Sequence, residues 1–162
     1  MEAVKYELEK KLKDNLSTLL ADYVDQYGEE LELPEPAEYA WDYDPNFTVF
    51  NKYPVCMILG FRELVNDRLS LGLRVVSENS IAVVMLIIDQ DPTKLDRKKS
   101  RYGEALVKFM KEFNSGTYER DYITMFGPNF EVNYTRAVRD EAVAAYLGSV
   151  WVFTDARVDT TL

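Results

Sequence analysis

Carboxylates are the residues of this sequence with the clearest capacity for chemistry. Asp89, Asp91 and Asp96 follow an apolar segment, where active-site loops often lie, and such a group could transfer protons or bind Mg²⁺. The same spacing suits the start of a helix, because an Asp beside Pro92 can accept hydrogen bonds from free backbone N–H groups. We favour the capping role, and we expect no metal site and no cofactor.

Other reactive groups are scarce. The chain has no histidine, which removes the commonest general base near neutral pH and the commonest zinc ligand. Cys56 is the single cysteine, and its place in the apolar run 54–60 predicts a core thiol rather than a nucleophile. Asp42 and Asp44 alternate but lack the glycine and the final glutamate of a calcium loop, and no glycines have a phosphate-binding spacing. We therefore predict a protein that binds other proteins, not an enzyme.

Negative charge is concentrated in one part of the chain. Between Asn15 and Asn51 there are nine acidic residues and no Lys or Arg. Because the whole chain has 28 acidic and 19 basic residues, its net charge of −9 is carried by this stretch and the remainder is formally neutral. An acidic stretch repels phosphates, so we expect no direct recognition of nucleic acid. It is either a solvated face or a patch that meets a basic partner.

A basic cluster on a predicted helix is the possible counterpart of that stretch. It consists of Arg97, Lys98, Lys99 and Arg101. One interpretation is a solvated helix face. The other is a patch that contacts the acidic stretch of a neighbouring copy, an arrangement that repeats head to tail and builds a ring.

The remaining pattern predicts the elements that position these residues. Apolar residues at intervals of three and four predict an N-terminal helix within residues 1–28, with Gly28 as its left-handed stop. Residues 29–53 contain prolines, acids and aromatics, and we expect an ordered connection there. Residues 54–162 contain strand patterns around a second helix at 93–114: a buried strand from Pro54 to Gly60, a strand at 69–76, a turn at 77–80 and the most apolar strand at 81–88.

Two more strand-like stretches, 122–138 and 142–158, predict a C-terminal hairpin. Because hairpins give antiparallel neighbours, we predict an α+β fold in a single domain, 1–162. Its sheet is mostly antiparallel with four or five strands, and both helices pack on one face. With a lone cysteine and no apolar stretch long enough to cross a bilayer, we expect a protein of the reducing cytoplasm that does not contact a membrane.

The order of these elements resembles that of tail terminator, or tail completion, proteins of long-tailed bacteriophages. The resemblance rests on the N-terminal helix ending in Tyr27-Gly28, the Leu33–Tyr39 segment, the Tyr53-Pro54-Val55 strand entry, the apolar 81–88 strand, the Arg101–Leu106 helix segment and the C-terminal strand pair. It covers nearly the full length of the chain.

This resemblance implies a structural virion protein that forms a ring, commonly a homo-hexamer. The ring would cap the tail tube, stop its polymerisation and join the tail to the head. The implied partners are further copies of the chain, the tail tube protein and the head–tail connector or neck proteins. The protein would be assembled in the host cytoplasm and found in the tail or neck of the virion. No catalytic residue is implied.

Loops are the expected docking elements of such a ring. The longest polar interruption among the predicted strands is 61–71, and we take Arg62, Glu63, Asp67 and Arg68 as contact candidates there, together with the connection 116–121 and the basic cluster. Three alternatives stay open: a head-completion or neck protein, a non-viral adaptor that dimerises through a sheet edge, and a small enzyme that uses Mg²⁺ bound by carboxylates.

Overall fold

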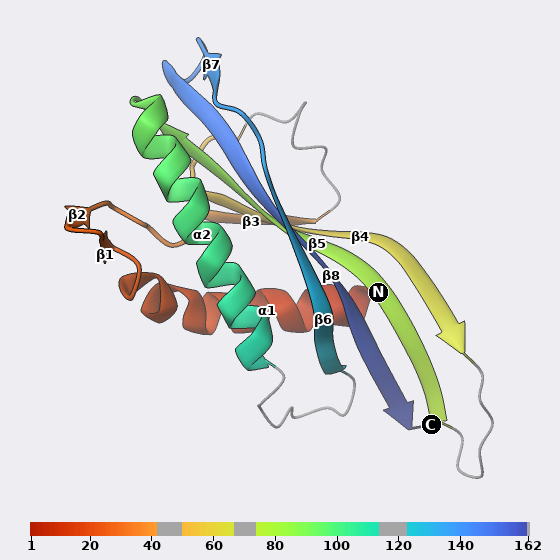
Figure 1. Cartoon of the computed structure of the whole chain (residues 1–162). Helices are drawn as coiled ribbons and strands as arrows, with labels where there is room; N and C mark the ends of the chain where they lie inside the picture. Colours follow the sequence, from red (N-terminus) through yellow and green to blue (C-terminus); the bar gives the residue numbers. More distant parts are fainter. Residues whose placement is uncertain (42–49, 67–73, 114–122, 162) are drawn as a thin grey trace.

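The computed structural model of this chain describes residues 1–41, 50–66, 74–113 and 123–161. The fold is α+β, with two helices and a mixed sheet (Figure 1). The main strands follow the order β3-β4-β5-β8-β6, and β7 pairs with β8. The elements are α1 (Glu2–Ala21), β1 (Asp25–Gln26), β2 (Glu29–Glu30), β3 (Glu38–Trp41), β4 (Val55–Asn66), β5 (Arg74–Asp89), α2 (Pro92–Phe113), β6 (Ile123–Tyr134), β7 (Val138–Asp140) and β8 (Ala145–Thr161).

The α+β class is confirmed, but the predicted sheet of four or five strands is too small. Within the described residues the sheet has six strands, and it is mixed because β3 runs parallel to β4. Part of the acidic connection, Glu38–Trp41, forms this parallel edge strand against Val55–Ile58. Its alternation is too short to reveal a strand in sequence, so pairing with β4 rather than local pattern decides its conformation.

The turn predicted at 77–80 is wrong, because these residues lie in the middle of the 16-residue strand β5. Ser77, Asn79 and Ser80 each form a side-chain hydrogen bond within the sheet, while the buried Oδ1 of Asn79 accepts none from the described residues. Asn79 donates from Nδ2 to Ser77 Oγ at 3.1 Å, and Ser80 donates from Oγ to Asp155 of β8 at 2.7 Å. A run of polar residues therefore continues the strand instead of ending it.

The first helix ends earlier than predicted. Residues 25–30 instead form a small antiparallel hairpin, β1–β2, which has Tyr27 and Gly28 at its turn. Both turn residues have positive φ, 59° and 70°, as a two-residue hairpin of this hand requires. The left-handed conformation predicted for Gly28 is thus present, but it closes a hairpin and not a helix.

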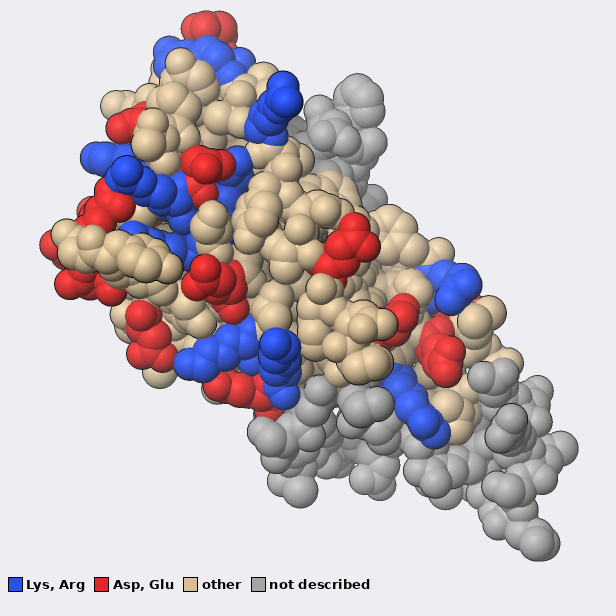
Figure 2. All heavy atoms as spheres, in the orientation of Figure 1, with Lys and Arg blue, Asp and Glu red and all other residues tan. Residues whose placement is uncertain are grey.

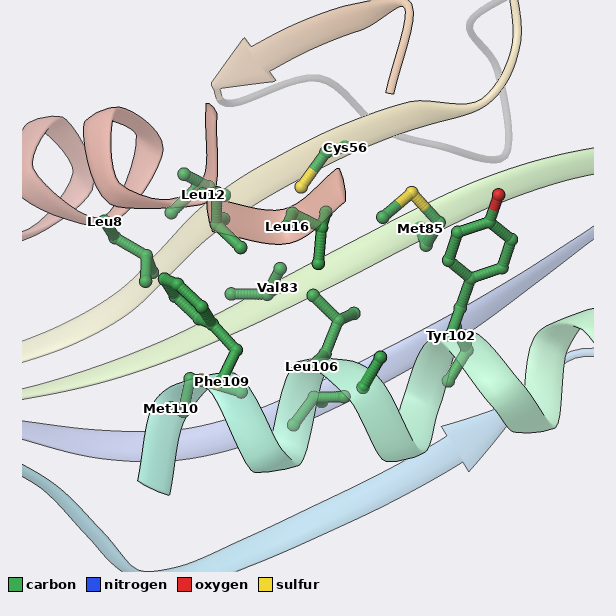
Figure 3. Close-up of a cluster of buried hydrophobic side chains, with 14 of the residues drawn as sticks. Leu8, Leu12, Leu16, Cys56, Val83, Met85, Tyr102, Leu106, Phe109 and Met110 are labelled. Carbon is green, nitrogen blue, oxygen red and sulfur yellow. The ribbon is translucent and has the colours of Figure 1, made fainter. Parts of the chain in front are cut away.

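The main core lies between the sheet and the two helices, which share one face (Figures 1 and 3). Leu8, Leu12 and Leu16 of α1 and Leu106 of α2 are almost completely buried against the inward side chains of β4 and β5, among which Cys56 has no exposed surface. The core position predicted for Cys56 is confirmed, and burial raises the pKa of its thiol.

Close approach of α2 to the sheet depends on a glycine. A Cβ atom at Gly103 would lie 3.0 Å from the Tyr134 hydroxyl and 3.1 Å from a methyl group of Val150. The preceding residue, Tyr102, is buried and its hydroxyl donates to the carbonyl oxygen of Pro34. The helix therefore contacts both the end of the sheet and the segment that leads into β3.

A second apolar cluster covers the opposite face of the sheet. The outward side chains of β4 and β5 are buried there, with Phe50 from the segment before β4 and with Trp151 and Phe153 of β8 packed against them. This cluster consists of Ala40, Phe50, Val55, Met57, Leu59, Ala82, Val84 and Leu86. The predicted C-terminal hairpin is confirmed as well, since β6 and β8 pair antiparallel.

We predict that Leu106→Ala lowers the free energy of unfolding by about 2–5 kcal/mol, because it leaves a cavity in the main core. Leu64→Ala is the matched control: Leu64 is partly exposed on β4, and its loss should cost less than about 1 kcal/mol. Urea unfolding of both variants measures the difference. Equal losses for the two leucines would contradict this account of the core.

Candidate assembly surface

The strands extend beyond the helical layer at one end of the molecule. The end of β4, the start of β5 and the end of β8 run past the N-terminus of α1 and the C-terminus of α2 (Figure 1). Large apolar side chains are exposed on this part of β4: Phe61 is 58% exposed, Leu64 43% and Val65 57%. Apolar residues grouped on one exposed strand are typical of a protein contact surface.

A bulge in β4 places the side chains of Phe61 and Arg62 on the face of the sheet that the helices do not cover. The register with β5 shifts between Gly60 and Arg62, so Phe61 has no opposite residue. Gly60 faces the start of α1, where a Cβ atom would collide with the Met1 side chain. We call the face of the sheet opposite the helices the far face. Arg62 lies opposite Ser80, which is two residues from Ala82 and therefore on the same, far face. Arg62 is exposed there.

A shallow groove crosses the far face beside the bulge. The Phe61 and Phe153 rings lie 5.8 Å apart, and Phe153 stacks on Trp151 at the same distance. The groove has a volume of about 310 Å³ and is lined by Phe61, Ser80, Asn129, Glu131, Phe153 and Asp155. It therefore extends from the β4 side of the sheet to β6.

Both edges of the sheet are open in the part of the chain that the structure describes. Strand β3 covers β4 only from Val55 to Ile58, so the outer edge of β4 from Leu59 onward has no paired strand. Strand β6 pairs with β8 on one side and with no described strand on the other. Unpaired N–H and C=O groups along such an edge can accept another strand.

A hollow of about 430 Å³ lies beside the β6 edge on the helix face. It is lined by Tyr23, Val107, Lys108, Lys111, Val132 and Tyr134. Burial raises the pKa of the Tyr134 phenol, and the nearby carboxylates of Glu104 and Asp96 raise it further, so the phenol stays neutral. The hollow beside the β6 edge is therefore lined by apolar and aromatic side chains together with lysines.

Of the partner-contact residues predicted in the 61–71 region, the structure describes two. Arg62 and Glu63 both lie on β4, in a strand and not in the expected loop. Glu63 faces the helices, where its carboxylate accepts from the α-amino group of Met1 at 3.2 Å. Asp67, Arg68 and the connection 116–121 lie outside the described residues.

The predicted basic cluster contacts its own chain. Arg97 forms an ion pair with Glu29, and Lys98 lies 2.8 Å from the Asp89 carboxylate. Lys99 and Arg101 are only 2% and 4% exposed, so they are interior residues. Figure 2 shows acidic and basic side chains side by side over β1, β2 and the start of α2. Whether Arg97 or Lys98 also contacts a partner stays a prediction.

Arg101 holds the β1–β2 hairpin against α2. Its guanidinium donates to the carbonyl oxygens of Val24 at 3.0 Å, Gln26 at 3.3 Å and Glu29 at 3.4 Å. The amine of Lys99 similarly donates to the carbonyl oxygen of Thr135, and it lies 3.1 Å from Asp96. The acidic stretch and the basic cluster therefore meet within one chain.

One of the carboxylates at the end of β5, that of Asp91, caps α2. Asp91 accepts from the backbone N–H of Thr93 at 2.8 Å and that of Lys94 at 3.4 Å, as the sequence predicts. Burial opposes ionisation of Asp89, but hydrogen bonds from Lys98 and from the Asp91 N–H outweigh it and hold the pKa of Asp89 below its usual value. Among the described residues, no group of acids, Cys or His is arranged to hold a metal ion.

Sequence reasoning missed the open edge of β6. Glu131 and Asn133 alternate there with Phe130, Val132 and Tyr134, which is a strand pattern, and a strand was predicted at this place. The pattern predicts which residues face the helices, but it does not indicate whether a strand is central or at an edge. Only the order of strands in the sheet decides that.

Comparison of the sequence with models of known protein families and with curated proteins found no match. No helix in the described parts of the chain is long and apolar enough to cross a membrane.

We predict that Arg101→Lys lowers the free energy of unfolding by about 2–3 kcal/mol, because an ammonium group cannot reach three separated carbonyl groups at once. Arg97→Lys is the matched control on the same helix face and should cost less than about 1 kcal/mol, since Arg97 is largely exposed. Thermal and urea unfolding compare the two variants. A tolerated Arg101→Lys would contradict the anchoring role of this side chain.

Proposed function

We propose that this protein is a structural subunit of a long-tailed bacteriophage, a tail terminator. Copies of the chain form a ring on the end of the tail tube, stop its polymerisation and provide the surface that joins the tail to the head. The resemblance in the order of elements supports the proposal, and so does the arrangement of the sheet edges.

The two open edges are the observation that carries the proposal. One edge is formed by β4 and the other, at the opposite end of the strand order, by β6, so they are different surfaces of the chain. When two copies bind through two different surfaces, the pair still has one free surface of each kind. Further copies can therefore add until the row of subunits closes into a ring. Edges arranged in this way support a ring more than they support a dimer.

The uneven covering of the sheet supports a capping role. A terminator must bind a tube end without presenting a new end of the same kind, so its two sides must differ. In this chain the helices cover one part of the sheet, and the strands project beyond them at one end (Figure 1). The two ends of a subunit therefore differ in shape.

A dimeric adaptor is the alternative that the open edges also allow. A strand at an edge can pair with the same strand of a second copy about a two-fold axis, which gives a dimer and no ring. A head-completion or neck protein would share the ring and differ only in its neighbours in the particle.

Deleting the gene from the phage that encodes it tests the proposal. Without a terminator, the tube polymerises unchecked, so we expect overlong tails and heads that carry no tail. Supplying the wild-type chain from a plasmid should restore tails of normal length. Electron microscopy of lysates measures tail length. Tails of normal length attached to heads in the deletion strain would overturn the proposal.

A further inference from the structure

We infer that the open edge of β4 in one copy pairs with the open edge of β6 in the next copy, so that the sheet continues from subunit to subunit. The inference rests on the proposed ring and specifies its contact. The occupant of each edge is a second copy of this chain.

Strand direction permits this pairing. Each of the neighbours β4, β5, β8 and β6 runs antiparallel to the one before it. The β4 strand of a second copy, placed beside β6, continues this alternation when both copies point the same way along the ring axis. Neighbours in a ring are related in this way, because they differ only by a rotation about that axis.

The usable parts of the two edges have similar lengths. No described strand pairs with the outer edge of β4 from Leu59 onward, and the exposed apolar side chains lie between Phe61 and Val65. On β6 the register is irregular between Phe126 and Phe130, and Pro128 has no N–H to donate. The regular edge is therefore Phe130–Tyr134, about as long as the β4 segment.

Charges complement each other across this junction. Arg62 is exposed on the far face of β4, and Glu131, opposite Phe153, is exposed on the far face of β6. Antiparallel overlap of Phe61–Val65 with Phe130–Tyr134 would make these two side chains diagonal neighbours, which is within the reach of long side chains. On the helix face the exposed carboxylate of Glu63 would approach Lys111, whose amine lies 5.8 Å from the centre of the Phe130 ring. Cross-strand pairs of opposite charge stabilise a sheet, and like charges destabilise it.

The same charges disfavour the two-fold alternatives. Pairing β6 with a second β6 would bring two Glu131 carboxylates to one face of the junction, and pairing β4 with a second β4 would do the same with two Arg62 side chains. Like-charge contacts of this kind suppress wrong pairings.

Charge reversal tests the pairing. We expect Arg62→Glu and Glu131→Arg each to raise the concentration needed for self-association by about tenfold, because each places like charges across the junction. The double variant Arg62→Glu/Glu131→Arg restores the attraction with reversed signs and should return that concentration to within about threefold of wild type. Light scattering and sedimentation over a range of concentrations measure the association.

Two controls keep the result specific. Glu32→Arg changes the charge by the same amount at an exposed position before β3 and should not alter association. Circular dichroism verifies that every variant is folded. Wild-type association with unaffected single variants, failure of the double variant to recover, or a wild type that stays monomeric at every concentration would each overturn the inference. Tail length in the deletion strain tests the proposed function separately, so a wrong pairing and a wrong function give different results.

Discussion

The packing of α2 across the middle of the sheet is the contact on which the rest of the structure depends. Its apolar side fills the main core, and Gly103 lets it approach β6 and β8 closely. Its charged side is equally important, because Arg101 and Lys99 donate to backbone carbonyl groups of the β1–β2 hairpin and of the segment after β6. One helix therefore joins the N-terminal, central and C-terminal parts of the chain. Buried cations are tolerated here because carbonyl oxygens and carboxylates surround them.

The same packing leaves the surface on which the proposed function rests. Strands of 16 and 17 residues are longer than the helical layer can cover, so β5 and β8 carry β4 beyond α1. Exposed apolar residues and an unpaired edge are liabilities in a monomer, since they invite uncontrolled association. In a subunit that assembles, they become the contact itself. Arg62 and Glu131 would then add selectivity more than affinity, because exposed charge pairs contribute little energy but penalise wrong neighbours.

Periodicity predicted the elements well wherever a strand or helix buries a regular apolar side. The two helices, the strand around 81–88 and the C-terminal hairpin are present, and Asp91 caps α2 as expected. Prediction failed where contacts distant in sequence decide the conformation. Ser77 and Asn79 stay in a strand because β5 is paired with β4 on one side and with β8 on the other. The chain that follows Ala21 is bound by Arg101, a contact that the sequence pattern does not reveal. Of the predicted contact residues, Arg62 lies on the open edge, but nothing in the local sequence revealed Lys99 and Arg101 as interior residues.

Amide hydrogen exchange of the two edges, compared between a dilute and a concentrated sample, tests the central claim most directly. Pairing between copies would supply partners for the free N–H groups of residues 60–65 and 130–134, so we expect both segments to exchange more slowly in the concentrated sample. Amides in the interior of α2 serve as the reference and should not change. Equal exchange of the two edges at both concentrations would contradict assembly through the sheet.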